Sequence, residues 1–337
     1  METLLVTGGL GFIGSNFIRY LLRETQYAVV NVDKITYAGN PTNLSDLEKD
    51  RRYKFYRADI ADFDAMNVIF GREKVDFVVN FAAESHVDRS IENPRLFLET
   101  NILGVQVLLD CARKYGVKKF LQVSTDEVYG SLSFTDPAFT EDLPLRPNSP
   151  YSASKAAADL LVRAYHHTFG MFTIVTRCSN NYGPFQFPEK LIPLMINNAL
   201  AERNLPVYGD GSNVRDWIFV EDHCRGILAA LERGQADAIY NFGGNAEIPN
   251  LTLVKQLLAT LGKPERLISY VKDRPGHDLR YAMNFSKAKA ELNWQPRYDF
   301  QTGLKNTVQW YLEHKKWLEQ VVSGEYQKYY DHMYKNR

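Results

Sequence analysis

Two adjacent carboxylates stand out in the middle of the chain. The segment VSTDEVYG (123–130) places Asp126 and Glu127 directly after the β-favouring residues KFLQVS (119–124). Two solvated acids on a surface turn are the ordinary interpretation of such a pair. In a dry cleft, each carboxylate disfavours ionisation of the other, so one can stay protonated beside a charged neighbour. Such a pair could supply a general acid and a general base at the same pH.

A tyrosine and a lysine follow at a spacing of four residues, in the segment YSASK from Tyr151 to Lys155. On a helix this spacing puts both side chains on one face. A cation beside a phenol favours the phenolate, so we expect Lys155 to lower the pKa of Tyr151. Tyr151 would then act as a general base towards a hydroxyl group while a nicotinamide accepts the hydride.

The glycine-rich segment TGGLGFIGS (7–15) follows an apolar run and precedes a helical pattern. Gly8 would permit a tight turn, Gly11 would let a diphosphate approach the backbone, and Gly14 would let helix and strand pack closely. Free N–H groups at the start of such a helix bind phosphate. Because strand, glycines and helix occur in this order, the segment predicts a dinucleotide-binding site.

Acidic residues at the ends of the next two apolar runs extend this expected cofactor site. Asp33 lies 19 residues beyond Gly14, where a carboxylate binds the hydroxyls of the adenosine ribose. A carboxylate there disfavours a 2′-phosphate and favours NAD over NADP, although the adjacent Lys34 weakens that preference. Asp59 and Ile60 end the third run, where adenine would lie. An alternative role for Asp33 is to cap the N-terminus of a helix.

The elements that must hold these residues alternate in the first half of the chain. Helical patterns, at 93–115 and 150–169 among others, separate strands predicted at 3–7, 28–32, 53–57, 77–82, 119–124 and 172–177. This order predicts an α/β fold, a Rossmann-type doubly wound parallel sheet with a smaller C-terminal α/β lobe. We expect an NAD-binding domain at 1–175 and a second domain at 176–337, although strands of either half could cross that boundary. An amphipathic helix is expected near 301–321.

Composition narrows the class of protein. Lysine plus arginine and aspartate plus glutamate number 40 each, which gives no indication of nucleic acid or an anionic membrane as a partner. No apolar run approaches the roughly 20 residues that span a bilayer. The start METLLVTGG lacks the features of a signal peptide. Cys111, Cys178 and Cys224 are scattered without metal-like spacing, so we expect buried thiols, no metal site and a cytoplasmic location.

Several segments together resemble a known family. TGGLGFIG, Asp33, NFAAESHVDRS and YSASK are similar to the extended short-chain dehydrogenase/reductases that act on nucleotide sugars. Relatives that epimerise C4 carry small residues in place of Asp126 and Glu127, and relatives that decarboxylate glucuronic acid lack the aspartate. The Thr-Asp-Glu triplet therefore resembles the dTDP-glucose 4,6-dehydratases, as do the segments at 178–193, 206–223 and 273–283.

The resemblance implies an NAD-dependent lyase that removes water from dTDP-glucose for deoxysugar synthesis of the rhamnose type. After oxidation at C4, Glu127 would take the C5 proton and Asp126 would protonate the leaving C6 hydroxyl, before the hydride returns to C6. Thr125 would hydrogen-bond the 4-hydroxyl beside Tyr151, with Lys155 completing the catalytic set. Consecutive strand residues face opposite sides, so both acids reach one sugar only if the chain bends after Thr125, past the end of the strand.

The resemblance also implies two sets of binding residues. The expected cofactor contacts are Gly8, Gly11, Phe12, Ile13, Gly14, Asp33, Lys34, Asp59, Ile60, Ala82, Ala83, Thr100, Tyr151, Lys155 and Asn181. The expected substrate contacts are Ser85, Thr125, Asn180, Lys190, Leu191, Pro206, Tyr208, Arg215, Asn250, Asp273, Arg274 and His277. In the second set, Arg215 would bind the diphosphate through its planar two-pronged guanidinium, and Tyr208 would stack on thymine.

Two alternatives stay open on the sequence: a 4,6-dehydratase of another nucleotide-glucose (UDP or CDP), and an NAD-binding sensor without turnover, which would lack the catalytic residues. The resemblance further implies a homodimer in which helices 93–115 and 150–169 of two chains form a four-helix bundle. Small residues on the second helix would permit close contact: Ala153, Ala156, Ala157 and Ala158.

Overall fold

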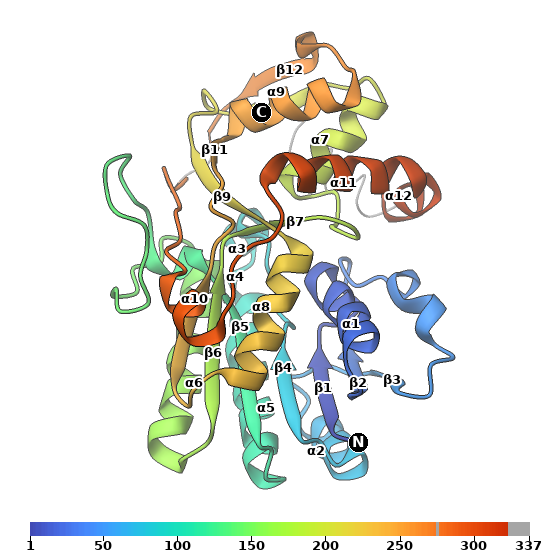
Figure 1. Ribbon diagram of the computed structural model, residues 1–337, viewed down its shortest axis with the longest axis vertical. Helices are drawn as coiled ribbons and strands as arrows, with labels where there is room; N and C mark the ends of the chain where they lie inside the picture. The colour runs from blue at the N-terminus through green and yellow to red at the C-terminus, as the bar shows by residue number, and fades with distance from the viewer. Residues whose placement is uncertain (274–275, 323–337) are drawn as a thin grey trace.

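A seven-stranded parallel β-sheet forms the centre of the larger lobe (Figure 1). The computed structural model describes residues 1–273 and 276–322. From edge to edge the strands are β10 (Ala238–Phe242), β6 (Thr173–Cys178), β5 (Lys119–Thr125), β4 (Phe77–Asn80), β1 (Thr3–Thr7), β2 (Ala28–Asp33) and β3 (Tyr53–Arg57). The order reverses between β1 and β4, the position at which open α/β sheets bind ligands.

Burial on both faces of the sheet explains why the strand segments are almost wholly apolar. Leu4 and Val6 of β1 belong to the core on one face, and Leu5 belongs to the core on the other. Leu5 pairs in register with Val30 of β2 and Val78 of β4. Every position of such a strand is buried whichever way its side chain points, which produces a continuous apolar run.

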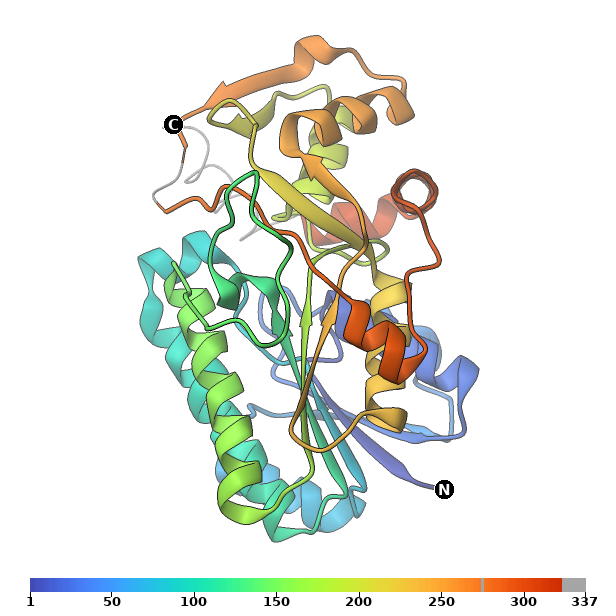
Figure 2. The same ribbon diagram turned by 60° about the vertical axis from the view of Figure 1, so that its left-hand side comes forward.

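Helices cover both faces of this sheet (Figure 2). One layer consists of α1 (Phe12–Glu24), α8 (Val220–Arg233) and α10 (Ser286–Leu292), and the other of α2 (Phe63–Glu73), α5 (Gly104–Lys114) and α6 (Pro150–Phe169). The arrangement confirms the predicted Rossmann-type α/β fold. Among the described helices, none has the length and apolarity to cross a bilayer.

A smaller lobe lies beyond the carboxyl ends of the strands and has its own apolar core (Figure 1). Its strands are β7 (Asn180–Tyr182), β9 (Val214–Phe219) and β11 (Glu247–Pro249) in one sheet, and β8 (Leu205–Tyr208) and β12 (Ile268–Val271) in another. Its helices are α7 (Leu191–Leu200), α9 (Asn250–Leu261), α11 (Phe300–Glu313) and α12 (Lys315–Val321). The chain crosses between the lobes several times, because β10, α8 and α10 follow β7 but belong to the larger lobe.

Two expected helices are interrupted in the structure. The segment 93–115 contains α4 (Pro94–Leu98), a π-helical turn η2 (Glu99–Leu103) and then α5, after the short helix α3 (Val87–Glu92). The π-turn buries Asn101, whose side-chain amide bonds both the N–H and the C=O of Glu84. The segment 301–321 is divided at His314 into α11 and α12. A uniform helix over either segment was therefore a wrong prediction.

Candidate active site

A cavity of about 290 Å³ lies at the carboxyl ends of β1, β2, β4, β5 and β6. All fifteen residues predicted to contact the cofactor line it, and so do all five predicted catalytic residues. These residues come from segments up to 173 positions apart in the chain, from Gly8 to Asn181, which the parallel sheet brings to one edge.

The glycine-rich turn leaves no space for side chains. Gly8 has φ of +68°, and a Cβ there would lie 2.7 Å from the backbone nitrogen of Ala82. A Cβ on Gly14 would lie 2.8 Å from the Cα of Gly9. The N-cap of α1 is Gly11, so no side chain caps the first N–H groups of the helix. A turn of this shape before an uncapped helix N-terminus fits the diphosphate of a dinucleotide.

Asp33 ends β2 inside the cavity and does not cap a helix. Its two carboxylate oxygens accept hydrogen bonds from the N–H of Leu10 at 3.0 Å and of Ile35 at 2.8 Å. Burial raises the pKa of Asp33, and these two bonds oppose the increase. The next helical turn, η1 (Pro41–Leu47), is capped by Asn40. The capping role considered for Asp33 is therefore wrong, and its remaining lone pairs suit ribose hydroxyls.

Lys34 is surrounded by oxygen atoms. Its ammonium donates to the hydroxyl of Thr100 at 3.0 Å and lies 3.4 Å from a carboxylate oxygen of Asp59 and 3.9 Å from one of Glu84. Glu84 is buried and was not predicted as a site residue. Because two carboxylates already balance its charge, Lys34 offers little attraction to a 2′-phosphate.

The chain bends after Thr125, as predicted for the adjacent acids. Thr125 is the last residue of β5, and Asp126 opens the 3₁₀ turn η3 (Asp126–Tyr129). The Thr125 hydroxyl donates to Oδ1 of Asp126 at 3.2 Å and accepts the N–H of Glu127 at 3.3 Å. The turn replaces the alternation of a strand, so both acids line the same cavity.

The two acids have different surroundings. Asp126 is only 2% exposed, and its Oδ2 has no hydrogen-bond partner among the described residues, whereas Glu127 is half-buried. Burial raises the pKa of Asp126 well above its ordinary value, and the charges of Glu127 and Asp216 raise it further against the opposing charge of Arg215. Burial therefore favours the protonated form of Asp126 beside a more solvated carboxylate, the arrangement that a general acid and a general base require.

Helix α6 presents Tyr151 and Lys155 to the cavity. The helix begins with Pro150, and Ser149 and Ser152 form a capping box that fixes its first turn. The Lys155 ammonium donates to the carbonyl of Val123 in β5 at 2.7 Å. Lysine and tyrosine are therefore held one turn apart on the buried face of α6.

The expected lowering of the tyrosine pKa does not occur in the protein alone. Burial raises the pKa of Tyr151 well above its ordinary value, and the charge of Glu127 raises it further, while the hydrogen bond with Thr125 opposes the increase. Burial also lowers the pKa of Lys155. Burial and the nearby carboxylate both disfavour loss of the tyrosine proton, so positive charge added to the cavity would favour Tyr151 as a base.

Part of the predicted substrate set reaches the same cavity. Ser85, Thr125, Asn180 and Lys190 line it. The Lys190 ammonium donates to the carbonyl of Ser85 at 2.9 Å, which joins the two lobes across the cavity, and Leu191 begins α7 directly after it. Oδ1 of Asn180 is buried without a partner among the described residues, so it can accept a ligand hydroxyl.

The other predicted substrate residues that the structure describes lie in the smaller lobe, outside this cavity. Tyr208 and Pro206 belong to β8, the ring of Tyr208 lies 6.1 Å from that of His277, and His277 Nδ1 lies 2.6 Å from Oδ1 of Asp273. Asn250 begins α9. Arg274 lies outside the described residues.

Arg215 lies between these residues and the acids. Its guanidinium donates to the carbonyls of Val214 at 2.8 Å and Asp278 at 2.9 Å and lies 4.3 Å from the centre of the Tyr281 ring. Its charge acts on Asp126, and that of Glu127 acts on Tyr281. The smaller lobe therefore meets the catalytic turn at Arg215.

Sequence reasoning missed several polar residues of the site. Besides Glu84, the cavity wall includes Gln186 and Glu189, and the charge of Asp216 acts on Asp126 from outside the wall. The buried Glu189 accepts the Tyr37 hydroxyl at 3.1 Å, from a loop that also borders the cavity. Glu84, Gln186, Glu189 and Asp216 all lie in segments that carried the family resemblance. No periodicity or spacing distinguishes them there, because their neighbours come from other parts of the fold.

Known proteins share both the sequence and the fold. The family model described as GDP-mannose 4,6 dehydratase matches residues 5–307. A dTDP-glucose 4,6-dehydratase of Escherichia coli is 49% identical over 351 residues, covering 96% of this chain and 97% of that protein. The structure of DesIV, a dTDP-glucose 4,6-dehydratase of Streptomyces venezuelae with NAD and TYD bound, superposes with a TM-score of 0.92 at 48% identity, covering 95% of this chain and all of that one. A UDP-glucose 4-epimerase of Thermotoga maritima reaches 0.86 at 32% identity, covering 93% of this chain and 99% of that one.

Proposed function

Since the chain belongs to the family described as GDP-mannose 4,6 dehydratase, we propose that it uses NAD to convert dTDP-glucose into dTDP-4-keto-6-deoxyglucose and water. One observation carries the proposal. Asp126, whose protonated form burial favours, lies beside the more solvated Glu127 in the same cavity as Tyr151 and Lys155. Oxidation alone needs only the tyrosine and the lysine, whereas elimination of water also needs an acid and a base.

Tyr151 starts the reaction by taking the proton of the sugar 4-hydroxyl, which Thr125 holds beside it. Bound NAD would accept the hydride from C4 and later return it to C6. Lys155 fixes the position of this part of α6 through its bond to Val123 and adds positive charge to the site. Gly8, Gly14 and Asp33 would hold the diphosphate and the ribose.

Elimination follows at the turn after β5. The C4 ketone makes the C5 proton acidic, and Glu127 removes it. The electron pair of that C–H bond forms the C5=C6 double bond as the C6–O bond breaks, and Asp126 protonates the departing hydroxyl to water. Return of the hydride to C6 would leave an enolate, which takes a proton at C5 from Glu127 after that carboxyl has exchanged with solvent. Exchange with solvent also passes on the proton that Tyr151 took from the 4-hydroxyl and restores the one that Asp126 gave to the leaving group, so the net change in the substrate is the loss of one water molecule.

The smaller lobe would bind the nucleotide. We assign the diphosphate to Arg215, which borders the catalytic turn, and the base to the region of Tyr208, Asp273 and His277. Oδ1 of Asn250 is buried without a partner among the described residues and can accept a donor of the ligand. The product would feed deoxysugar synthesis of the rhamnose type.

Incubation of the purified protein with dTDP-, UDP- and CDP-glucose tests the reaction and the nucleotide together. We expect a 4-keto-6-deoxy product from dTDP-glucose, formed much faster than from the other two, and NAD released when the protein is denatured. If the product formed from UDP- or CDP-glucose instead, that nucleotide sugar would be the substrate in place of dTDP-glucose. Bound NAD without product from any of the three would indicate the sensor.

We also propose a homodimer formed by α4–α5 and α6. Ala153, Ala157, Leu160 and Ala164 form an apolar stripe on the outer face of α6, and Leu160 is 58% exposed. Ala156 and Ala158 are buried within the chain, so their expected role in partner contact is wrong. A two-fold axis would bury this stripe against its own copy. Light scattering should give twice the chain mass at micromolar concentration, and Leu160→Glu should give a monomer.

A further inference from the structure

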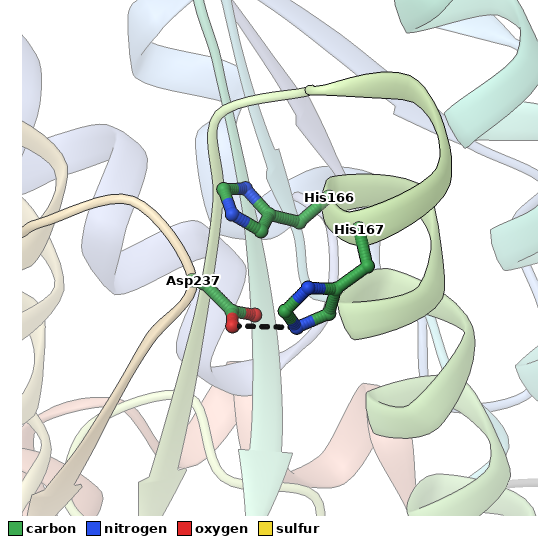
Figure 3. Close-up of side chains that lie close together, drawn as sticks. All are labelled: His166, His167 and Asp237. Atoms are coloured by element: carbon green, nitrogen blue, oxygen red, sulfur yellow. Dashed lines mark ion pairs between the residues drawn. The ribbon is translucent and has the colours of Figure 1, made fainter.

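Two histidines and an aspartate lie close together, and none of the three lines the cavity (Figure 3). His166 and His167 belong to the last turn of α6, and Asp237 lies in the loop that enters β10. One potential ligand atom of each side chain lies within 4.8 Å of the other two. We propose that these three side chains bind Zn²⁺, a metal site that the cysteine pattern did not predict.

The hydrogen bonds prepare both rings for a metal ion. His166 Nδ1 lies 2.8 Å from the carbonyl of Met171, which can only accept, so Nδ1 carries the proton and Nε2 keeps its lone pair. Bonds of this kind orient metal-binding histidines in zinc proteins. His167 Nε2 lies 2.9 Å from Oδ2 of Asp237. A zinc ion would replace the proton between these two atoms and bind both.

The backbone holds the aspartate in place. Asp237 has φ of +60°, and its N–H donates to the carbonyl of Thr173 at 2.8 Å, which ties the loop to β6. Around a tetrahedral zinc ion with bonds of roughly 2.0–2.2 Å, ligand atoms lie about 3.3–3.5 Å apart. The ligand atoms must therefore move closer together than they are in the structure, and the exposed His167 can do so by rotating its side chain.

Electrostatics favour a cation at this position. The negative end of the α6 dipole lies at the turn that carries both histidines. Arg163 lines the same surface recess as Asp237 and opposes a cation, so we expect moderate rather than tight binding. Two imidazoles and one carboxylate leave a fourth position for water, as in three-ligand zinc sites. Bound zinc would connect the end of α6 to the edge strand β10.

Calorimetric titration of the untagged, chelator-treated full chain with ZnCl₂ tests the site. We expect one Zn²⁺ per chain and a higher melting temperature in its presence. His167→Ala and Asp237→Asn should each weaken binding by at least about 100-fold, since even outer-shell changes cost 10–100-fold. Asp237→Asn keeps the size of the side chain, which guards against a folding artefact.

His314→Ala is the matched control, because it removes another exposed histidine outside the cluster. It should bind zinc like the parent. Cobalt(II) should give the visible bands of a four-coordinate site in the parent and in His314→Ala, and not in the two cluster variants. Zinc binding that survives both cluster substitutions, or a parent that binds no zinc, would overturn the proposal.

Discussion

Replacing Asp126 by asparagine removes a proton donor while keeping the size of the side chain. The asparagine carbonyl can still accept the Thr125 hydroxyl, as Oδ1 of the carboxyl does at 3.2 Å, but the amide cannot supply a carboxylic proton. Loss of general acid catalysis typically costs ~10²–10⁴-fold, or about 3–5 kcal/mol in activation free energy. Elimination should therefore become the slow step, while oxidation at C4 proceeds.

A single turnover with dTDP-glucose separates the two steps. In Asp126→Asn we expect the near-ultraviolet absorbance of reduced nicotinamide to appear and persist, and in Tyr151→Phe almost none. Glu127→Gln should also retain the absorbance and should lose solvent-deuterium incorporation at C5, which Asp126→Asn should keep. The control is Asp136→Asn, which alters an exposed carboxylate in a surface loop and should behave like the parent. Normal turnover by Asp126→Asn would show that Asp126 does not act as the general acid.

The same variant tests the electrostatics of the site without catalysis. The pKa of Asp126 is higher in the folded protein than its ordinary value of 3.8, so folding takes up a proton. Its contribution to stability is therefore lost as the pH rises from 3.8 through the raised pKa. As the pH increases over this range, the unfolding free energy of Asp126→Asn should therefore decrease less than that of the parent. Equal pH dependence in the two proteins would contradict the buried, protonated acid.

Three further substitutions test the cofactor turn, the nucleotide contact and a buried histidine. Gly14→Ala should lower the NAD content of the purified protein, because its Cβ would lie 2.8 Å from Cα of Gly9. The control is Gly71→Ala in α2, which should keep the NAD and increase the unfolding free energy by up to ~1 kcal/mol. Arg215→Ala should raise KM for the nucleotide sugar by roughly 10–100-fold with a smaller change in kcat, because it removes a charged contact worth about 1.5–3 kcal/mol; an unchanged KM would place the diphosphate elsewhere. Burial lowers the pKa of His223 from 6.5 to about 3, so the parent loses up to about 1.4 kcal/mol per pH unit as the pH falls through this range. His223→Gln should show a shallower loss in denaturant titrations, and an equal slope would contradict a neutral buried ring.

The sheet could be predicted because its strands are buried on both faces. Runs such as TLLVT (3–7) are apolar at nearly every position, and their ends differ from the observed strands by at most two residues. The glycine turn could be predicted as well. Glycine is required at positions 8 and 14 because of contacts within a short stretch of chain and with the nearest strand.

Features that depend on distant contacts could not be predicted. The π-turn at 99–103 buries Asn101 against the backbone of Glu84, which belongs to another segment. The apolar pattern of 93–115 gives no indication of this bond. Likewise, the charge of Asp216 acts on Asp126 only because the whole fold brings this residue of β9 near the turn after β5. The role of a buried polar residue therefore depends on residues from distant segments, which the local sequence pattern does not indicate.

The contrast between Tyr151 and Asp126 shows how burial acts in opposite ways in one cavity. Burial raises the pKa of both groups. For Asp126 this is the useful direction, because a donor must hold its proton until the C6–O bond breaks. For Tyr151 it is the wrong direction, because a base must be able to lose its proton. Positive charge brought into the cavity, such as that of an oxidised nicotinamide ring, would lower the pKa of the tyrosine, so we expect its activation to depend on cofactor binding. Removal of the 4-hydroxyl proton would then occur only when an acceptor for the C4 hydride is in place.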